Sequence, residues 1–285
     1  MDDSRILIIG AYGQLGKALL AKYPKATPVD RDTFDMTDWE KVKNYDWSKV
    51  DVIINAAAYT NVDGAEAPEG REAAWKVNAT GPGYLSKIAT EHGLTLVHVS
   101  SDYVFDGTRD PHTEDEPFTP LGVYGQSKAA GDLAVGITPK HYILRTTWLI
   151  GDGPNFVRTM LNLAEKNVSP TVVADQVGRL TFTHALVDGV VTLLESKAEY
   201  GTYNLTNGGE PASWADITRT IFKDLGRDDL TVTDTTTEEY FKSKPGVAPR
   251  PLKSSMDLTK IEATGLKLPD WRDDLKNYIA KELEQ

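Results

Sequence analysis

Cysteine is absent from the 285-residue chain. Its absence excludes disulfide bonds, zinc sites built from thiolates and a cysteine nucleophile, and it is typical of a cytoplasmic protein. The sequence also lacks any run of about 18 apolar residues, so we expect no membrane-spanning helix. Residues 1–5 are polar and lead directly into an apolar segment, which predicts no signal peptide. We therefore expect a cytoplasmic protein with no membrane partner, and we assign no metal site.

Positive charge is scarce as well. The 31 lysine and arginine residues stand against 42 aspartate and glutamate residues, which gives a formal net charge of −11. Such a surface repels nucleic acid, and the sequence has no basic stripe, so we expect no nucleic-acid partner. The apolar share of 40% and the chain length are ordinary for a globular protein with one large domain or two small ones.

A glycine-rich turn is the first feature that carries chemistry. The apolar run at residues 5–9 predicts a buried strand, and residues 17–23 predict a helix. Between them the glycines have the spacing G-x-x-G-x-x-G, which permits a tight turn and close approach of a pyrophosphate to the helix N-terminus. The pattern predicts a dinucleotide site at Gly10, Gly13, Gln14, Leu15 and Gly16.

The next segment bears on the choice of cofactor. Asp30 ends a short predicted strand at residues 26–30, where an acid that binds the adenosine ribose is expected. Arg31 follows directly, and an arginine here suits a 2′-phosphate instead. The choice between NADPH and NADH therefore stays open. Asp35 and Met36 are candidates for the adenine pocket.

Two further strands end in residues suited to a ligand site. Residues 50–55 lead into Ala56, Ala57, Ala58 and Tyr59, where small side chains let a ligand approach the backbone. Residues 94–99 lead into a serine pair that includes Ser101. Between the strands, we interpret Asp63 and Glu66 as part of a solvated turn at residues 61–71, and we expect a long helix at residues 73–92, interrupted near residues 81–83.

Tyr124 and Lys128 are the central pair. Four residues apart, they lie on one face of a predicted helix. A phenol beside an ammonium is a plausible acid, since the positive charge lowers the tyrosine pKa below its usual value of about 10. The preceding loop at residues 108–120 is polar, and we interpret it as lying outside the core.

The order of elements predicts an α/β fold, a Rossmann-type doubly wound parallel sheet with a smaller C-terminal substrate-binding α/β region. We expect residues 1–150 plus about 181–207 to form the nucleotide-binding domain, and about 151–180 plus 208–285 the substrate-binding region. Asn155 predicts a helix start, either an ordinary capped helix or a second anion site. Arg250 lies in a loop bracketed by prolines and is a candidate phosphate contact.

Together, the glycine turn, the alanine-rich strand end, the strand-end serine and Tyr-x-x-x-Lys resemble an extended short-chain dehydrogenase/reductase. A closer resemblance is to the dTDP-4-dehydrorhamnose reductase family, from the first strand to about residue 271. It rests on residues 56–63, 101–107, 145–148, 155–157, 173–176 and 250–251. The chain differs from the family pattern at Tyr12, Gly64, Ser101 and Leu180, where asparagine, a larger residue, threonine and proline are usual.

The resemblance implies reduction of the C4 ketone of dTDP-4-dehydro-L-rhamnose with NADPH or NADH, in a monomer or a homodimer. It implies that Tyr124 donates the proton, that Lys128 holds the nicotinamide ribose and lowers the tyrosine pKa, and that Ser101 hydrogen-bonds the carbonyl oxygen. It further implies a dTDP-sugar partner, bound by Thr60, Val62, Ser101, Asp102, Tyr103, Tyr124, Trp148, Asn155 and Arg250.

Two other functions remain open at this point. One is another nucleotide-sugar enzyme, an epimerase or a dehydratase; a dehydratase of this type has Asp-Glu after the strand-end hydroxyl, whereas here Asp102 is followed by Tyr103. The other is a non-catalytic NADP-binding protein similar to the regulatory subunit of methionine adenosyltransferase. The intact Ser101, Tyr124 and Lys128 favour an enzyme.

Overall fold

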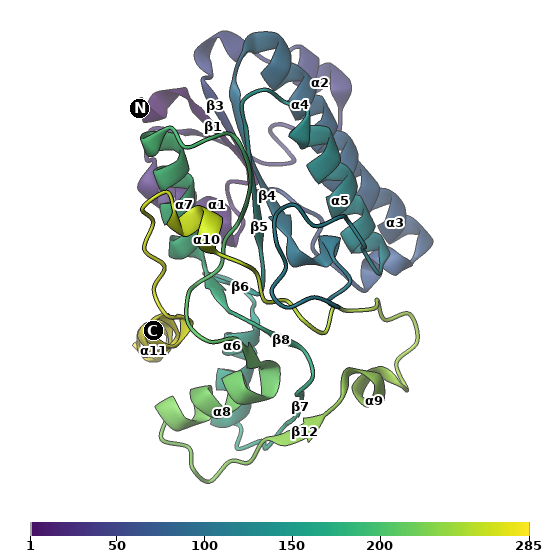
Figure 1. The fold of residues 1–285 in the computed structure, drawn as a ribbon, viewed down its shortest axis with the longest axis vertical. Coiled ribbons are helices and arrows are strands. Elements are labelled where there is room, and N and C mark those ends of the chain that lie inside the picture. The colour runs from purple at the N-terminus through teal and green to yellow at the C-terminus, as the bar shows by residue number, and fades with distance from the viewer. Residues whose placement is uncertain (1, 285) are drawn as a thin grey trace.

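The computed structural model describes residues 2–284, and within them the central feature is a six-stranded sheet (Figure 1). All its strands run parallel, in the spatial order β10-β5-β4-β3-β1-β2. The strands are β1 (Ile6–Ile9), β2 (Thr27–Val29), β3 (Val52–Asn55), β4 (Thr95–Ser101), β5 (His141–Thr146) and β10 (Gly201–Asn204). This order confirms the predicted doubly wound α/β fold, with its topological switch between β1 and β3.

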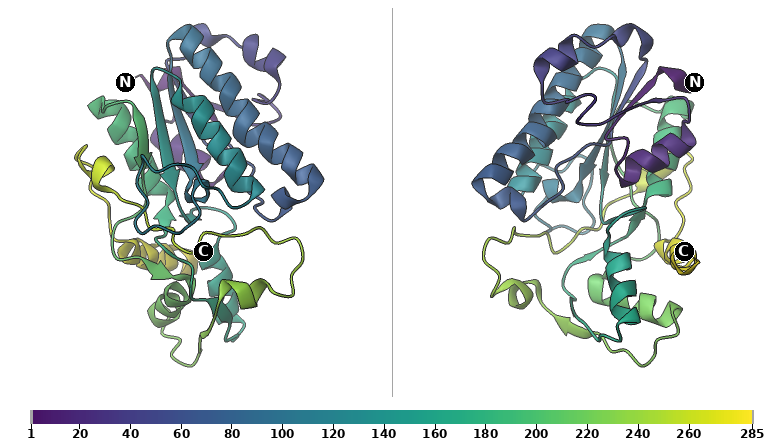
Figure 2. Two further views of the ribbon diagram at one scale, coloured as in Figure 1. Left: turned by 45° about the vertical axis from the view of Figure 1, so that its right-hand side comes forward. Right: turned by 180° about the vertical axis from the view of Figure 1, so that it is seen from behind.

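Helices cover both faces of the sheet (Figure 2). One face carries α1 (Gln14–Lys22) and α7 (Thr183–Ser196), and the other carries α4 (Gly81–His92) and α5 (Val123–Gly136), flanked by α2 (Trp39–Lys43) and α3 (Pro68–Trp75). Along β1, Ile6 and Ile8 pack into the core under α1 and α7, while Leu7 and Ile9 pack into the core under α4. Burial on both faces explains why this strand is an uninterrupted apolar run.

The helical region after β3 differs from the prediction. The helix begins at Pro68, earlier than expected, and continues through a π-helical turn at Lys76–Thr80 into α4. The predicted interruption at residues 81–83 is wrong, because the amide of Gly81 bonds the carbonyl of Lys76 and Pro82 stands at the start of α4. Pro82, which has no amide proton to donate, stands just after the π-helical turn and does not break the helix.

The loop at residues 108–120 is mostly exposed, as interpreted, but His112 and Glu116 are buried, so the interpretation was wrong at these two positions. His112 is fully buried, and its Nδ1 lies 2.8 Å from Glu116 Oε2. Arg145 on β5 donates to the backbone carbonyl of Glu114 at 2.9 Å. The amide of Asn204 on β10 donates to the carboxylate of Glu114 at 3.0 Å. Polar side chains are acceptable in a core when their hydrogen bonds are made, as they are here.

The C-terminal half has a core of its own. It contains α6 (Phe156–Glu165), α8 (Trp214–Asp224) and α11 (Trp271–Leu283), which bury Val157, Ile221 and Leu275 together. Asn155 caps α6 and Ser213 caps α8. The remaining elements are β6 (Leu149–Ile150), β7 (Thr171–Val173), β8 (Val177–Gly178), β9 (Thr181–Phe182), β11 (Ala212–Ser213), β12 (Thr233–Thr235), α9 (Thr237–Phe241) and α10 (Thr259–Glu262).

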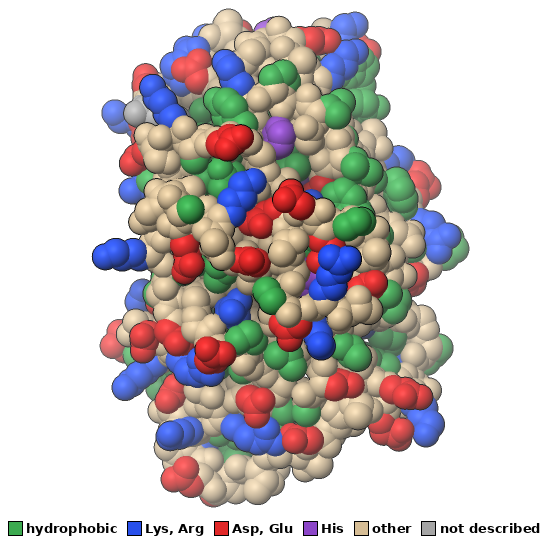
Figure 3. Space-filling view, in the orientation of Figure 1, with side chains coloured by type: hydrophobic (Ala, Val, Ile, Leu, Met, Phe, Trp, Pro, Cys, Tyr) green, Lys and Arg blue, Asp and Glu red, His purple; other side chains and the backbone are tan. Residues whose placement is uncertain are grey.

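We propose to keep the division into two domains at the expected boundaries, since β10 and α7 pack with the sheet although they follow α6 in the chain. One segment crosses this division, because Met256, Leu258 and Ile261 pack into the core of the sheet. Acidic and basic side chains are interspersed on the face shown in Figure 3. Each helix within residues 2–284 is too short or too polar to cross a bilayer.

Candidate active site

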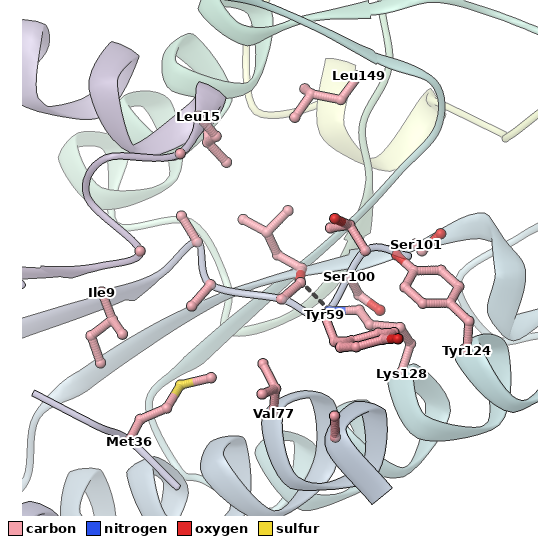
Figure 4. Close-up of a pocket in the computed structure, with 18 of the residues that line it drawn as sticks. Ile9, Leu15, Met36, Tyr59, Val77, Ser100, Ser101, Tyr124, Lys128 and Leu149 are labelled. Carbon is pink, nitrogen blue, oxygen red and sulfur yellow. Dashed lines mark hydrogen bonds between the residues drawn. The ribbon is translucent and has the colours of Figure 1, made fainter. Parts of the chain in front are cut away.

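A cavity of about 1030 Å³ lies at the carboxyl ends of the strands, where doubly wound sheets bind ligands. Figure 4 shows Ile9 and Met36 towards one end and Ser101 and Tyr124 towards the other. Most of the predicted site residues line it: Gly10, Gly13, Gln14, Leu15, Asp30, Arg31, Asp35, Met36, Ala56, Ala57, Ala58, Tyr59, Thr60, Val62, Ser101, Asp102, Tyr103, Tyr124, Lys128 and Trp148. Gly16, Asn155 and Arg250 do not.

The glycine turn is shaped for a dinucleotide. Gly10 has a φ of +77°, and a Cβ there would lie 2.7 Å from the amide nitrogen of Ala57. A Cβ on Gly16 would overlap the carbonyl oxygen of Gly10. Gly13 precedes α1 and offers no side-chain cap, so the first amides of that helix are open to an anion. The diphosphate of a dinucleotide fits a tight turn with open helix amides. Gly16 does not line the cavity, but it lets α1 pack closely against this turn.

Two loops meet at the start of α1. The side-chain amide of Gln14 donates to the carbonyl of Pro154 at 3.1 Å, and Lys17 pairs with Asp152 at 3.0 Å. The glycine-rich loop after β6, residues 151–154, therefore contacts the start of α1 beside the dinucleotide turn. Since the Gln14 side chain is engaged in this way, its backbone amide is the group that remains for a phosphate.

The acid and the base after β2 both reach the cavity. Asp30 Oδ1 accepts hydrogen bonds from the hydroxyl of Thr33 at 2.8 Å and from its amide at 3.0 Å, and these bonds lower the pKa of Asp30. Asp30 is therefore a carboxylate, and Arg31 is exposed beside it. Met36 is buried against Gly81 at the same end of the cavity. This arrangement accommodates either nicotinamide cofactor.

Two asparagine side chains that were not among the predicted site residues hold the strand ends in place. Asn78 Oδ1 accepts from the amide of Tyr59 at 2.9 Å, and its Nδ2 donates to Ser127 on α5 at 3.1 Å. Asn55 Oδ1 accepts from the amide of Ala57 at 3.1 Å. Asn78 lies in the π-helical turn, a structure often found at functional sites. The signal available in the sequence was an asparagine, Asn78, at a position of the predicted helix that faces the sheet.

Tyr124 and Lys128 project from α5 into the cavity as predicted, but their pKa values differ from the expectation. Burial raises the pKa of Tyr124 to about 12 and outweighs the opposing effect of the nearby Ser101 hydroxyl. Burial lowers the pKa of Lys128 to about 8, and its Nζ donates to the carbonyl of Val99 at 2.7 Å. The predicted lowering of the tyrosine pKa by Lys128 was therefore wrong for the protein alone, because burial dominates.

Ser101 and its neighbour form a buried network. The Ser101 hydroxyl donates to Asp102 Oδ1 at 3.0 Å, and the Ser254 hydroxyl donates to Asp102 Oδ2 at 2.5 Å. Burial raises the pKa of Asp102 to about 6, although these two hydroxyls oppose the shift. The ring of Tyr103 meets that of Tyr124 edge to face, with centroids 5.4 Å apart. Ser254, distant in sequence, completes the network.

The two predicted substrate contacts outside the cavity have other partners. The Asn155 side chain accepts from the amide of Arg158 at 3.0 Å and donates to Tyr278 at 2.9 Å, which favours the ordinary capped helix over a second anion site. Arg250 donates to both carboxylate oxygens of Asp63 at 2.9 Å. Direct substrate contacts by Asn155 and Arg250 stay predictions.

Asp63 and Glu66 are structural anchors, so their interpretation as a solvated turn was wrong. Asp63 also accepts from the amide of Ala248 at 3.0 Å, and Glu66 Oε1 accepts from the amide of Val123 at 2.8 Å. Val123 is the first residue of α5, and Gly122 before it offers no side-chain cap. Glu66 thus caps the helix that carries Tyr124 and Lys128.

Comparison with known proteins places the whole chain in one family. The chain is 39% identical to a dTDP-4-dehydrorhamnose reductase from Aggregatibacter actinomycetemcomitans, over 97% of this chain and 99% of that one. A crystal structure of a dTDP-4-dehydrorhamnose reductase from Clostridium acetobutylicum matches with a TM-score of 0.90 and 39% identity, over 98% and 99% of the two chains. A structure of the reductase from Bacillus anthracis in complex with NADP matches with a TM-score of 0.88 and 33% identity, over 97% and 99%. Residues 4–284 match the model of the RmlD substrate binding domain, and the chain belongs to that family.

Proposed function

We propose that this protein is a dTDP-4-dehydrorhamnose reductase, which reduces the C4 ketone of dTDP-4-dehydro-L-rhamnose to the hydroxyl of dTDP-L-rhamnose with NADPH or NADH. The observation that carries the proposal is a single cavity in which Ser101, Tyr124 and Lys128 face the same space as the glycine turn. Relatives of this name match the chain over nearly its full length, which supports the same reading.

The reduced nicotinamide supplies a hydride to the ketone carbon when it is bound. Tyr124 then donates its proton to the ketone oxygen, and Ser101 donates a hydrogen bond to the same atom. Both act on charge that grows only as the carbonyl becomes an alkoxide, which is where stabilisation accelerates a reaction. A pKa of about 12 keeps Tyr124 protonated at neutral pH, as a proton donor must be.

Lys128 positions the cofactor for this reaction. Its Nζ is held by the carbonyl of Val99, one residue before the serine pair at the end of β4. The ammonium has two further protons to donate, which suits the hydroxyls of a nicotinamide ribose. Lys128 therefore orients the cofactor beside Tyr124.

Ser101 has only one proton, and in the structure it goes to Asp102. The hydroxyl must turn towards the ketone, or Asp102 must be protonated, before Ser101 donates to the substrate. With a pKa of about 6, Asp102 exchanges its proton close to neutral pH. Asp102 is therefore the group that competes with the ketone for the Ser101 proton.

The test is oxidation of NADPH and of NADH, followed at the nicotinamide absorbance, with enzymatically generated dTDP-4-dehydro-L-rhamnose. We expect consumption that depends on the sugar nucleotide, and the two rates measure the preference between cofactors. Cofactor binding without consumption would overturn the proposal and favour a non-catalytic NADP-binding protein. Conversion of dTDP-glucose into a 4-keto-6-deoxy sugar would instead identify a dehydratase.

We also propose that the reaction takes place in the cytoplasm, because a cysteine-free chain suits a reducing compartment. The protein acts there as a monomer or as a homodimer. Light scattering of the purified protein distinguishes the two.

A further inference from the structure

Trp148, which lies between β5 and β6, has an unusual backbone. Its φ is +41°, in the left-handed region that bulky residues rarely adopt. Its carbonyl accepts a hydrogen bond from the amide of Thr181 at 3.1 Å, and its side chain lines the cavity. A strained residue persists only where its surroundings over-determine its conformation, and such residues gather at functional sites.

A second tryptophan fixes the orientation of this ring. The indoles of Trp148 and Trp214 are stacked, with centroids 3.8 Å apart and planes inclined by 24°. Phe156 from α6 packs against Trp214 in turn, with centroids 4.3 Å apart. A Cβ on Gly178 would lie 3.1 Å from Trp148 Cζ2, so the indole also lies close to the backbone of β8.

The elements that carry these contacts are joined to each other. Trp214 is the first residue of α8, where Ser213 and Asp216 form a reciprocal cap that fixes the helix start. The strand just before it, β11, pairs with β8, and Ala212 lies opposite Gly178. A Cβ on Gly178 would also lie 3.1 Å from Ser254 Cβ, so Gly178 neighbours both the indole and the residue that bonds Asp102.

We propose that Trp214, which does not itself line the cavity, is a positioning residue that holds the Trp148 indole as a wall for the sugar nucleotide. This inference rests on the proposed function. The stacked pair sets the affinity for the sugar nucleotide and leaves that for the nicotinamide cofactor unchanged, because the glycine turn and the residues after β2 lie elsewhere in the cavity. Trp214 thereby links α8 of the C-terminal half to the substrate.

The experiment compares Trp214→Leu, Trp214→Phe and a control, Trp75→Leu, which removes a tryptophan on α3 that is 42% exposed. Circular dichroism of the indole bands reports the coupling of the two stacked indoles. Calorimetric titration with dTDP-L-rhamnose in the presence of NADPH measures binding without turnover, because the sugar and the cofactor are then both reduced. We expect Trp214→Leu to abolish the coupled signal and to weaken dTDP-L-rhamnose binding about tenfold, with NADPH affinity unchanged. Trp214→Phe retains a stacked ring, so its binding stays within about threefold of wild type.

The outcomes separate this inference from the function on which it rests. Binding of dTDP-L-rhamnose that is equal in wild type and Trp214→Leu, after loss of the coupled signal, would overturn the role of Trp214 alone. So would an equal weakening of NADPH binding, since that indicates a general structural defect. A wild-type protein that binds NADPH but not dTDP-L-rhamnose would overturn both the inference and the proposed substrate.

Discussion

At the scale of single residues, burial decides the charge states in the site. The phenol of Tyr124, the ammonium of Lys128 and the carboxyl of Asp102 all have pKa values shifted towards their neutral forms, and desolvation is the largest cause in each. A closed, weakly hydrated site strengthens every hydrogen bond to a developing alkoxide. The same burial costs stability at neutral pH where the group is charged, as for Lys128 and Asp102, but not for Tyr124, whose phenol is uncharged in both the folded and the unfolded chain.

Replacement of Tyr124 by phenylalanine removes the proton donor and keeps the ring. We expect kcat to fall about 100- to 10,000-fold while NADPH affinity stays unchanged, because general acids contribute this much and the fold is preserved. Steady-state kinetics and a fluorescence titration measure the two quantities. Tyr84→Phe, on α4 against Trp39, is the matched control. A near-wild-type rate in Tyr124→Phe would refute the assignment of the donor.

Replacement of Lys128 by methionine should stabilise the protein and abolish turnover. The Lys128 pKa falls from 10.5 to about 8 on folding, so below pH 8 the buried ammonium costs stability. At about 1.4 kcal/mol per pKa unit, the shift from 10.5 to about 8 corresponds to roughly 3.5 kcal/mol, and loss of the hydrogen bond to Val99 offsets about 1 kcal/mol of this. We therefore expect Lys128→Met to be about 2–3 kcal/mol more stable than wild type at pH 7. Between pH 8 and 10.5 the unfolded chain binds this proton more strongly than the folded protein, so wild-type stability rises and the difference shrinks.

Urea unfolding at pH 7 and at pH 9.5 measures this prediction. Lys43→Met, an exposed lysine on α2, is the control and should leave the unfolding free energy nearly unchanged at both pH values. A Lys128→Met variant that is no more stable than wild type at pH 7 would contradict the prediction.

At the scale of elements, three short segments bring the site together. The turn between β1 and α1 approaches the end of β3 so closely that Gly10 meets the backbone of Ala57. The π-helical turn before α4 places Asn78 where it bonds both the β3 end and α5. The short helical turn at Gly64–Glu66 caps α5 through Glu66. Each contact joins segments that are not neighbours in the chain.

Gly10→Ala tests the first of these contacts. It adds left-handed strain and a clash with Ala57, whereas Gly93→Ala at φ +66° has nothing within 4 Å and adds strain alone. We expect Gly93→Ala to lose about 1–2 kcal/mol of unfolding free energy and Gly10→Ala to lose more. Only Gly10→Ala should also weaken NADPH binding. Equal losses in the two variants, with cofactor affinity unchanged, would show that the close approach at Gly10 is unimportant.

At the scale of the whole molecule, contacts between distant segments hold the C-terminal half over the site. One cluster joins Asp63 to Arg250 and to the amide of Ala248. The guanidinium of Arg250 also lies over the ring of Phe241, 4.5 Å from its centroid. The segment from α9 to Pro251 is thereby fastened to the half that carries Tyr124. Trp148 and Trp214 make a second connection between the halves.

A double-mutant cycle of Asp63→Ala and Arg250→Ala measures the first connection. Asp63 is 47% exposed, so solvent screens the pair, and we expect a coupling of about 1 kcal/mol in urea unfolding. Hydrogen exchange of residues 242–250 should accelerate in Asp63→Ala. The exposed pair Lys87–Glu91, 3.9 Å apart, is the control cycle and should show almost no coupling. Zero coupling between Asp63 and Arg250 would show that this pair does not hold the segment from α9 to Pro251 in place.

The sequence by itself determined the sheet, the dinucleotide turn and the pair on α5. These features depend on short-range geometry: apolar runs form buried strands, G-x-x-G-x-x-G follows one of them, and Tyr124 and Lys128 are one helical turn apart. Parallel strands also bring their carboxyl ends to one edge, which is why residues after β1, β3, β4 and β5 share the cavity. Such rules need no knowledge of distant partners.

Only the tertiary structure decided the partners of polar residues. Asp63 and Glu66 read as a solvated turn because Arg250 lies 187 positions away from Asp63 in the chain and nothing local marks the pairing. The loop that contains His112 read as exposed because the groups that satisfy it come from β5, β10 and beyond. The Tyr124 pKa depended on burial, and the stack of Trp148 on Trp214 depended on how α8 packs. Desolvation and long-range pairing arise only when the whole chain has folded.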